Sequence, residues 1–130
     1  MKKKILFVAW FLAAAIAMHA QVTQINSNKS LEVNFPLSNT KAIVVSALDN
    51  SLWVTDGTLA GTIQISATIK YDGGGLVLSG KFIFRGNTAA TGSEVYITDG
   101  TGIGTVLVRD IYNGPISSNP GDFVTMNGIV

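Results

Sequence analysis

The sequence predicts an all-β protein made of repeated antiparallel β-hairpins, and three observations lead to that fold class. A short motif occurs twice, its flanks alternate β-branched or aromatic residues with polar ones, and no window after residue 20 keeps helical periodicity. Gly, Thr, Val, Ile and Asn are abundant in the same region. We therefore expect strands joined by turns, without helices in the mature chain.

The N-terminal segment predicts a cleavable export signal. Three lysines at residues 2–4 precede an uninterrupted apolar run over residues 5–18, and these are the charged and hydrophobic regions of a signal peptide. The apolar run is shorter than the ~20 residues that a membrane-spanning helix needs. We expect cleavage after Ala20 and no stable membrane span afterwards. The product is then secreted or on the outer cell surface, with the periplasm as an alternative.

The mature composition excludes several kinds of chemistry. Cleavage removes three of the nine Lys and Arg residues and none of the eight Asp and Glu residues, so the mature chain is weakly acidic and lacks a basic patch for nucleic acid. The single histidine, His19, falls inside the signal, and the sequence has no cysteine. Neither thiol nor imidazole is available for catalysis or metal binding, and we expect no cofactor.

An internal repeat organises the rest of the chain. Residues 52–65 (LWVTDGTLAGTIQI) return as residues 95–108 (VYITDGTGIGTVLV), 43 positions further along. The aromatic Trp53 is matched by Tyr96. The identical positions are Thr55, Asp56, Gly57, Thr58, Gly61 and Thr62, which recur as Thr98, Asp99, Gly100, Thr101, Gly104 and Thr105. These residues are the candidate structural motif, and no catalytic or metal-binding set accompanies them.

Each copy of the motif predicts a hairpin. An alternating apolar run ends at Asp-Gly, a pair that tolerates the positive φ angles of turns, and a second β-branched run follows the next Gly-Thr. Asp56 and Asp99 are placed to bond the backbone of their own turns. Residues 41–45 and 80–84 predict a further strand before each copy. Residues 126–130 resemble the start of that strand a third time.

The spacing of the repeat predicts propeller-like blades. A period near 43 residues with several short strands per unit is typical of β-propeller blades, which have four strands each. Propellers close with about four to eight blades, whereas this chain holds two units and the start of a third, so the predicted ring is incomplete. The chain divides into a signal peptide (1–20), an N-terminal strand or linker segment (21–40) and the repeats (41–130).

The repeat resembles a known bacterial family. Residues 52–62 look like the "ELWxTDGTxxGT" repeat of large secreted proteins from Bacteroidetes-type bacteria, although Ser51 replaces the usual glutamate and Tyr96 replaces tryptophan in the second copy. Residues 108–123 resemble the family's "VKDIxPGxxSSNPxxF" continuation, which residues 71–75 of the first copy lack. The resemblance runs from about Lys41 to the end. It implies propeller-like repeats, often followed by a C-terminal secretion sorting domain, and a short or truncated member.

The repeated aspartates have two interpretations. Asp56 and Asp99, with Asp110 and Asp122, could supply oxygen ligands to calcium. Their spacing does not match an EF-hand loop, and calcium needs six or more oxygens from converging groups. We favour turn formation and rank calcium well below it.

The repeated aromatic residues also have two interpretations. Trp53 and Tyr96 offer flat rings on which a sugar can stack, since aromatic side chains supply large amphipathic contact areas. Their recurrence at equivalent strand positions is more typical of packing within each unit. We favour packing.

Two further patterns superficially suggest catalysis. Residues 73–75 and 100–104 are glycine-rich, but neither stretch opens a helix or carries the Lys-Ser/Thr of a phosphate-binding loop, so we expect a flexible connection and a hairpin turn. Glu32, Glu94 and several aspartates would allow the carboxylate pair of a glycosidase. The best-placed acids lie in the repeated turns, however, and we expect no enzyme activity.

The favoured function is a non-catalytic, exported or cell-surface repeat module that serves as a protein or glycan interaction scaffold. Its hairpin turns would present residues 59–60 and 102–103 to the partner, on a rigid base of strands. One alternative is the N-terminal fragment of an exported carbohydrate-active enzyme. Another is a truncated product without independent function, whose open strand edges would favour self-association.

Overall fold

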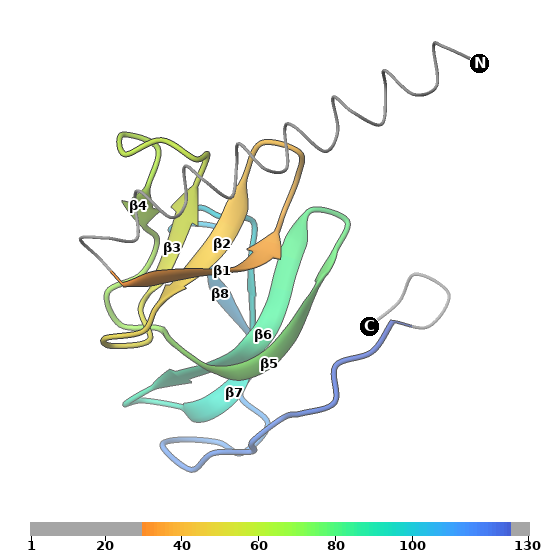
Figure 1. The fold of residues 1–130 in the computed structure, drawn as a ribbon. Helices are drawn as coiled ribbons and strands as arrows, with labels where there is room; N and C mark the ends of the chain where they lie inside the picture. The colour runs from red at the N-terminus through yellow and green to blue at the C-terminus, as the bar shows by residue number, and fades with distance from the viewer. Residues whose placement is uncertain (1–29, 126–130) are drawn as a thin grey trace, which may run out of the picture.

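A computed structural model describes residues 30–125, with all of their side chains except those of Val33 and Asn34. These residues form eight β-strands and no helix, so the all-β prediction is confirmed (Figure 1). Accordingly, this part of the chain contains no helix able to span a membrane. The predicted export signal and the predicted start of a third copy lie outside the described residues.

The strands form two four-stranded antiparallel sheets in which each strand pairs with its neighbour in sequence. The first sheet contains β1 (Leu31–Pro36), β2 (Ala42–Ser46), β3 (Leu52–Thr55) and β4 (Ile63–Gln64). The second sheet contains β5 (Lys70–Leu78), β6 (Lys81–Thr88), β7 (Gly92–Thr98) and β8 (Val106–Arg109). The strands expected over residues 41–45 and 80–84 are β2 and β6, and each repeated motif forms a hairpin, β3–β4 or β7–β8.

The two sheets pack against each other around one apolar core (Figure 1). Its aromatic rings form a ladder. Phe35 of β1 stacks on Phe82 of β6 with ring centroids 3.9 Å apart, and Phe82 stacks on Phe84 at 5.0 Å. Tyr96 of β7 continues the ladder 6.1 Å from Phe84. Large aromatic side chains dominate core energetics. The stacking of Phe35 on Phe82 therefore contributes much of the contact between the two sheets.

Alternation along the strands gives the second sheet two different faces. Phe82 and Phe84 of β6 and Tyr96 of β7 belong to the core between the sheets, whereas Ile83 and Ile97 do not. Successive residues of a strand point to opposite faces of a sheet. The second sheet therefore has an inner face, which contacts the first sheet, and an outer face, which points away from it.

The expectation of a flexible connection at residues 73–75 is wrong. These three glycines lie inside β5, at two irregularities in its pairing with β6. Gly75 has a φ of 137°, and a Cβ there would lie 2.8 Å from the Phe82 ring. The glycines let β5 pass close to a core aromatic residue, a requirement that composition alone does not show.

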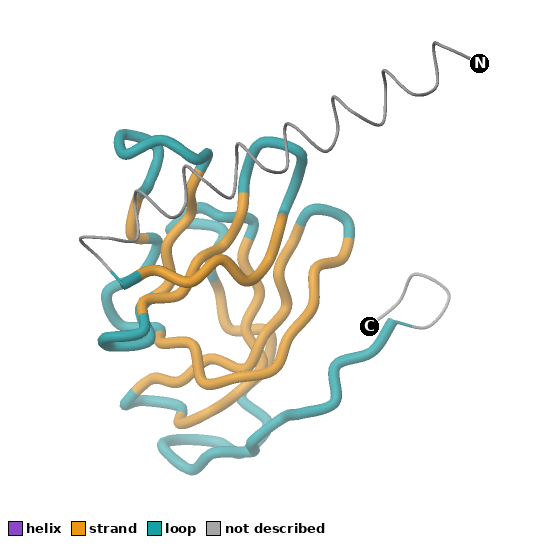
Figure 2. The backbone as a smooth tube through the Cα atoms, in the orientation of Figure 1, coloured by secondary structure: helices purple, strands orange, loops and turns teal. Residues whose placement is uncertain are grey.

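Residues 110–125, the exit segment, follow β8 and contain no strand; Figure 2 shows them as loop. The segment lies along the second sheet. The Pro120 carbonyl accepts a hydrogen bond from Arg85 of β6, and Phe123 lies against Gly74 of β5. The chain therefore leaves β8 and crosses back towards β5.

Candidate functional site

The repeated motif forms a turn that its own side chains hold together. In the first copy the turn joins β3 to β4. The Thr58 N–H and hydroxyl both donate to Asp56 Oδ1, at 2.9 and 2.7 Å, and the Gly61 N–H donates to Thr58 Oγ1 at 2.9 Å. A carboxylate that binds the backbone two residues ahead forms an Asx-turn. Asp56 therefore organises the turn in which it lies.

Two buried threonine hydroxyls close the base of the same turn. The Thr62 hydroxyl donates to the Thr58 carbonyl at 2.6 Å and lies 2.8 Å from the Thr55 hydroxyl. A hydroxyl has one proton, so Thr55 donates to Thr62. Thr55 Oγ1 in turn accepts from the Gly57 N–H at 3.0 Å. Gly57 has a φ of 90°, a conformation that glycine adopts readily.

The second copy repeats this network bond for bond. The Thr101 N–H and hydroxyl donate to Asp99 Oδ1 at 2.9 and 2.7 Å, and the Thr105 hydroxyl donates to the Thr101 carbonyl at 2.6 Å. The Thr98 and Thr105 hydroxyls lie 2.7 Å apart. Gly100 has a φ of 88°. The two turns thus have the same local geometry although they belong to different sheets.

The second glycine of each motif is required for space. A Cβ at Gly61 would lie 2.0 Å from Asp56 Oδ1, and a Cβ at Gly104 would lie 2.1 Å from Asp99 Oδ1. Real Cβ atoms do not approach other atoms so closely. A larger residue at either position would therefore displace the carboxylate that organises the turn.

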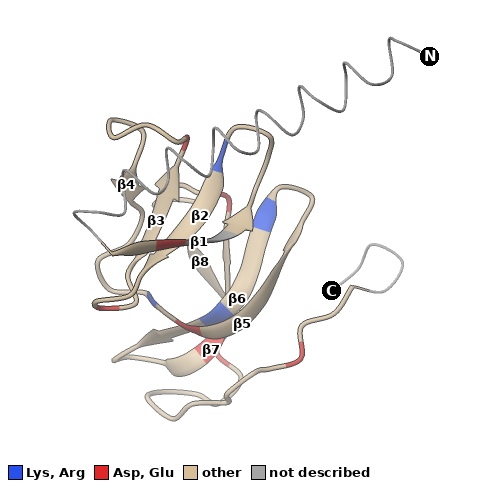
Figure 3. Cartoon of the chain, in the orientation of Figure 1, with Lys and Arg blue, Asp and Glu red and all other residues tan. Residues whose placement is uncertain are grey.

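Both turn carboxylates favour the ionised state. The hydroxyl and N–H of Thr58 hold the pKa of Asp56 below its ordinary value, and those of Thr101 do the same for Asp99. Lys41 and Lys81 add a smaller favourable charge to Asp56 and Asp99 respectively. Figure 3 shows Lys and Arg interspersed with Asp and Glu over both sheets.

The tips of the two turns are exposed and apolar. We define the turn tips as residues 59–60 and 102–103. The Leu59 side chain is 71% exposed and that of Ile103 is 97% exposed. The Asp and Thr side chains of each turn bond within the turn, while an aliphatic side chain is left at its tip.

Trp53 and Tyr96 occupy equivalent strand positions in different environments. Tyr96 is only 3% exposed, lies in the core between the sheets, and has its hydroxyl 2.8 Å from that of Thr91. Trp53 packs beside Val44 on the other face of the first sheet, and its Nε1 donates to Ser51 Oγ at 2.9 Å. Tyr96 therefore packs against the neighbouring sheet rather than only within its own unit, and its ring is enclosed.

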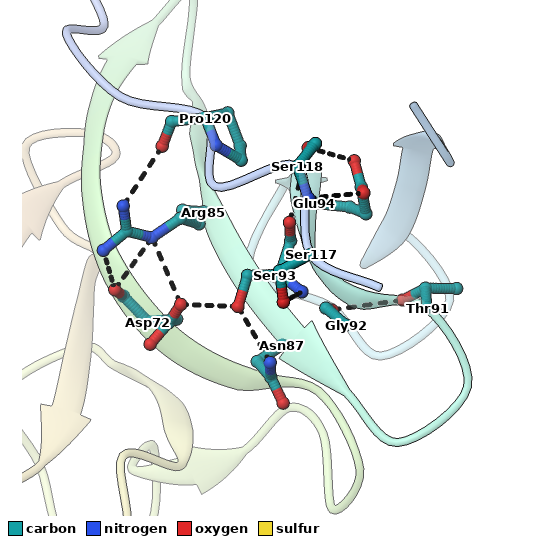
Figure 4. Close-up of polar contacts among 10 residues, drawn as sticks. All are labelled: Asp72, Arg85, Asn87, Thr91, Gly92, Ser93, Glu94, Ser117, Ser118 and Pro120. Carbon is teal, nitrogen blue, oxygen red and sulfur yellow. Dashed lines mark hydrogen bonds and ion pairs between the residues drawn. The ribbon is translucent and has the colours of Figure 1, made fainter. Parts of the chain in front are cut away.

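A polar cluster lies at the end of the second sheet where the exit segment returns (Figure 4). Arg85 Nε lies 3.2 Å from Asp72 Oδ2, which also accepts from the Ser93 hydroxyl at 2.6 Å. Asn87 Nδ2 donates to Ser93 Oγ at 2.8 Å. Arg85 reaches the Pro120 carbonyl as well, at 3.4 Å. The cluster thus connects β5, β6 and β7 with the exit segment.

Glu94 of β7 anchors the exit segment beside this cluster. Its side chain has no exposed surface, and its carboxylate accepts from the N–H groups of Ile111, Tyr112 and Ser118 at 3.1, 3.3 and 3.1 Å. The Ser118 hydroxyl donates to the same carboxylate at 2.6 Å (Figure 4). Burial alone would raise the pKa of Glu94, but these hydrogen bonds outweigh it and hold the pKa below its ordinary value.

The anchoring role of Glu94 is absent from the sequence prediction, which noted this residue only as an acid available for a glycosidase pair. A signal that could have found it lies in the sequence motifs on which the expected resemblance was based. Glutamate precedes the aromatic residue in the family's repeat, and the Ser-Ser-Asn-Pro run at residues 117–120 supplies Ser118 as its partner. Glu94 and the serine run are therefore two parts of one hydrogen-bonded contact.

The residues from 30 to 125 include no group of three or more His, Cys, Asp or Glu side chains that could hold a metal ion. The four aspartates considered for calcium therefore do not meet in such a group. Asp110 Oδ2 instead accepts from the Gly114 N–H at 3.1 Å, and Asp122 lies in the exit segment with a φ of 54°.

No protein-family model, curated protein or solved structure matches the chain. Function is therefore inferred from the geometry of the turns, the polar cluster and the two sheet faces.

Proposed function

We propose that this chain is a non-catalytic, exported β-repeat module that acts as an interaction scaffold for a protein or a glycan. The two turns, which share one hydrogen-bond network, carry the proposal. Each turn bonds its Asp and Thr side chains internally and leaves an aliphatic side chain, Leu59 or Ile103, exposed at its tip. Rigid turns with exposed apolar tips lose little conformational entropy when a partner binds.

The arrangement of the sheets supports propeller-like blades within this module. Each sheet has four antiparallel strands in sequential order, and the two sheets are stacked one on the other. Consecutive four-stranded sheets of this kind are the building units of propellers. The turn tips would then recur once in every blade and form a repeated contact surface.

The state of the carboxylates supports a scaffold rather than an enzyme. Asp56 and Asp99 bind their own turns, and Glu94 binds four donors of the exit segment. A general acid needs a raised pKa near the working pH, whereas the pKa of each of these groups is lowered. These acids therefore lack the electrostatic setting of a glycosidase acid.

Binding screens with tip variants test the proposal. The full chain, Leu59→Ser and Ile103→Ser are screened on a glycan array and against a random-peptide display library. We expect a ligand whose affinity falls at least tenfold in the tip variants while the Tm is unchanged. Val108→Ser, which alters an aliphatic residue that is 56% exposed on β8 away from the tips, is the matched control.

Two results would contradict the proposal. One is binding that the tip variants leave unaltered, or the absence of any ligand from both screens. The other is release of shortened glycans from the array, detected by mass spectrometry, which would support a carbohydrate-active enzyme instead.

A further inference from the structure

The two sheets pack front to back rather than through equivalent faces. Val54 of the first sheet corresponds to Ile97 of the second by the repeat, and their pairing partners, Ile43 and Ile83, correspond as well. Ile43 and Val54 lie in the core between the sheets, whereas Ile83 and Ile97 lie on the outer face of the second sheet. The outer face of the second sheet is therefore equivalent to the face with which the first sheet contacts the second. Among the described residues, no sheet packs against this outer face.

The outer face carries an aliphatic row across all four strands. Directly paired residues form this row: Leu76, Ile83, Ile97 and Val106. Val106 is 47% exposed and the other three are half-buried. The corresponding Ile43 in the first sheet is fully buried by the contact between the sheets. The row is thus the apolar half of a sheet-to-sheet contact.

The outer face carries a charged residue, Arg85, where its counterpart carries an aliphatic one. Arg85 pairs with Val95 in the second sheet, where Val45 pairs with Leu52 in the first. The Arg85 charge is compensated by Asp72 in the polar cluster. The polar end of the outer face is therefore contacted by the exit segment, and the aliphatic row is left for another element.

The backbone bond that joins the first sheet to β5 also recurs. The Asn50 carbonyl accepts from the Tyr71 N–H at 2.8 Å, near the start of β5. Forty-three residues after Asn50, the Ser93 carbonyl accepts from the Ser118 and Asn119 N–H groups at 3.1 and 3.2 Å. The exit segment is thus bonded to the second sheet in the way that the start of β5 is bonded to the first. Since β5 is the first strand of the second unit, the exit segment lies where the first strand of a further unit would begin.

We propose that the outer face of the second sheet is a docking surface for a third unit of the same repeat, continued on the same polypeptide from the exit segment. That unit would place aromatic rings, equivalent to Phe84 and Tyr96, against the aliphatic row. Those two rings already fill the corresponding face of the first sheet. The docking surface rests on the propeller-like arrangement of the proposed function, but it is separate from the turn tips and does not depend on ligand binding there.

A three-unit chain tests the proposal. The predicted start of the third copy ends at Val130, which aligns with Phe82 of the second unit. The three-unit chain is therefore made by adding a second copy of residues 83–125 directly after Val130. Ile97→Lys is introduced into both the three-unit chain and the parent. We expect the variant to lower the Tm by about 10 °C in the three-unit chain and by about 2 °C in the parent, because only the former buries Ile97 against a sheet.

Hydrogen exchange and a matched variant complete the design. We expect the added strands to be protected from exchange in the three-unit chain and to lose that protection with Ile97→Lys. Thr68→Lys, which adds the same charge at an exposed position, should shift the Tm equally in both chains. An added unit without protection, or equal Ile97→Lys shifts in both chains, overturns the proposal. A parent dimer in light scattering that Ile97→Lys dissociates also overturns it, in favour of a second copy as the occupant.

Discussion

The two units share one turn and differ in the residue that lies two positions before their central aromatic residue, Trp53 or Tyr96. In the first unit, Ser51 donates to Asp49 Oδ1 at 2.6 Å and accepts from Trp53, so the hydrogen bonds of its side chain stay within two residues. In the second unit, Glu94 takes the equivalent place and binds donors from Ile111 to Ser118. One longer, charged side chain therefore converts a local contact into an anchor for a distant segment.

The units also differ in what surrounds their central aromatic residue. Tyr96 is enclosed between the sheets, whereas Trp53 lies on the face of the first sheet away from the second. The repeat thus fixes the conformation of the turn, and the place of a unit in the stack decides which of its faces is covered. Burial is a property of the pair of sheets rather than of either motif.

The largest effect is expected where the two units meet. Phe84→Ala removes a fully buried ring that contacts Phe82 and Tyr96, and we expect it to lower the free energy of unfolding by about 3–5 kcal/mol. Urea unfolding followed by far-UV circular dichroism measures the change. Ile83→Ala, next in the same strand but on the outer face, should lower it by about 1 kcal/mol. Equal losses would show that the sheets do not meet through this face.

The next effect concerns the anchor. Glu94→Gln keeps the size of the side chain but places an NH₂ donor among backbone N–H donors, so some of those groups lose their acceptor. We expect the amides of Ile111 and Ser118 to exchange with solvent about 100-fold faster, measured by hydrogen exchange.

Ser51→Ala is the matched variant for this anchor. Its hydrogen bonds involve Asp49 and Trp53, so the exchange rates of the exit segment should not change. Parental exchange rates in Glu94→Gln, or acceleration by both variants, would argue against a specific anchor at Glu94.

A smaller and equal effect is expected in the two turns. Gly61→Ala and Gly104→Ala each place a Cβ against the turn carboxylate, and we expect each to lower the free energy of unfolding by about 1–3 kcal/mol. In an Asp99→Ala background the cost of Gly104→Ala should shrink, because the carboxylate that it meets is gone. A difference of more than about 1 kcal/mol between the single variants would mean that the surroundings, not the motif, set the turn geometry.

Sequence patterns predicted the hairpins because their contacts are local. The bonds from Thr58 to Asp56 and from Thr62 to Thr58 span two and four residues, so the spacing of these residues contains the information. The strands β2 and β6 were predicted for the same reason, from short runs of apolar residues. The export signal and the start of a third copy remain predictions, since they lie outside the described residues.

Sequence patterns did not predict the features that depend on contacts between residues far apart in the chain. The partners of Glu94 lie 17 to 24 residues further along the chain. The burial of Tyr96 depends on the first sheet, and the glycines of β5 depend on the Phe82 ring. In each case the deciding neighbour comes from a separate strand or segment, which no local pattern identifies.

The smallest expected effect is a pH dependence that distinguishes the two turns within one molecule. Asp99 has a folded pKa below its ordinary value of 3.8, so its stabilising contribution is complete above that value and is lost as the pH falls through the lowered folded pKa. Thr101→Val removes the hydroxyl donor, and we expect the pKa of Asp99 to rise towards 3.8 while that of Asp56 stays low, measured by NMR titration of the carboxyl carbons. Thr101→Ser, which keeps the hydroxyl, should retain the low pKa of Asp99. A rise at both aspartates would mean that the turns communicate through the core, whereas a rise at Asp99 alone shows that each motif holds its own carboxylate.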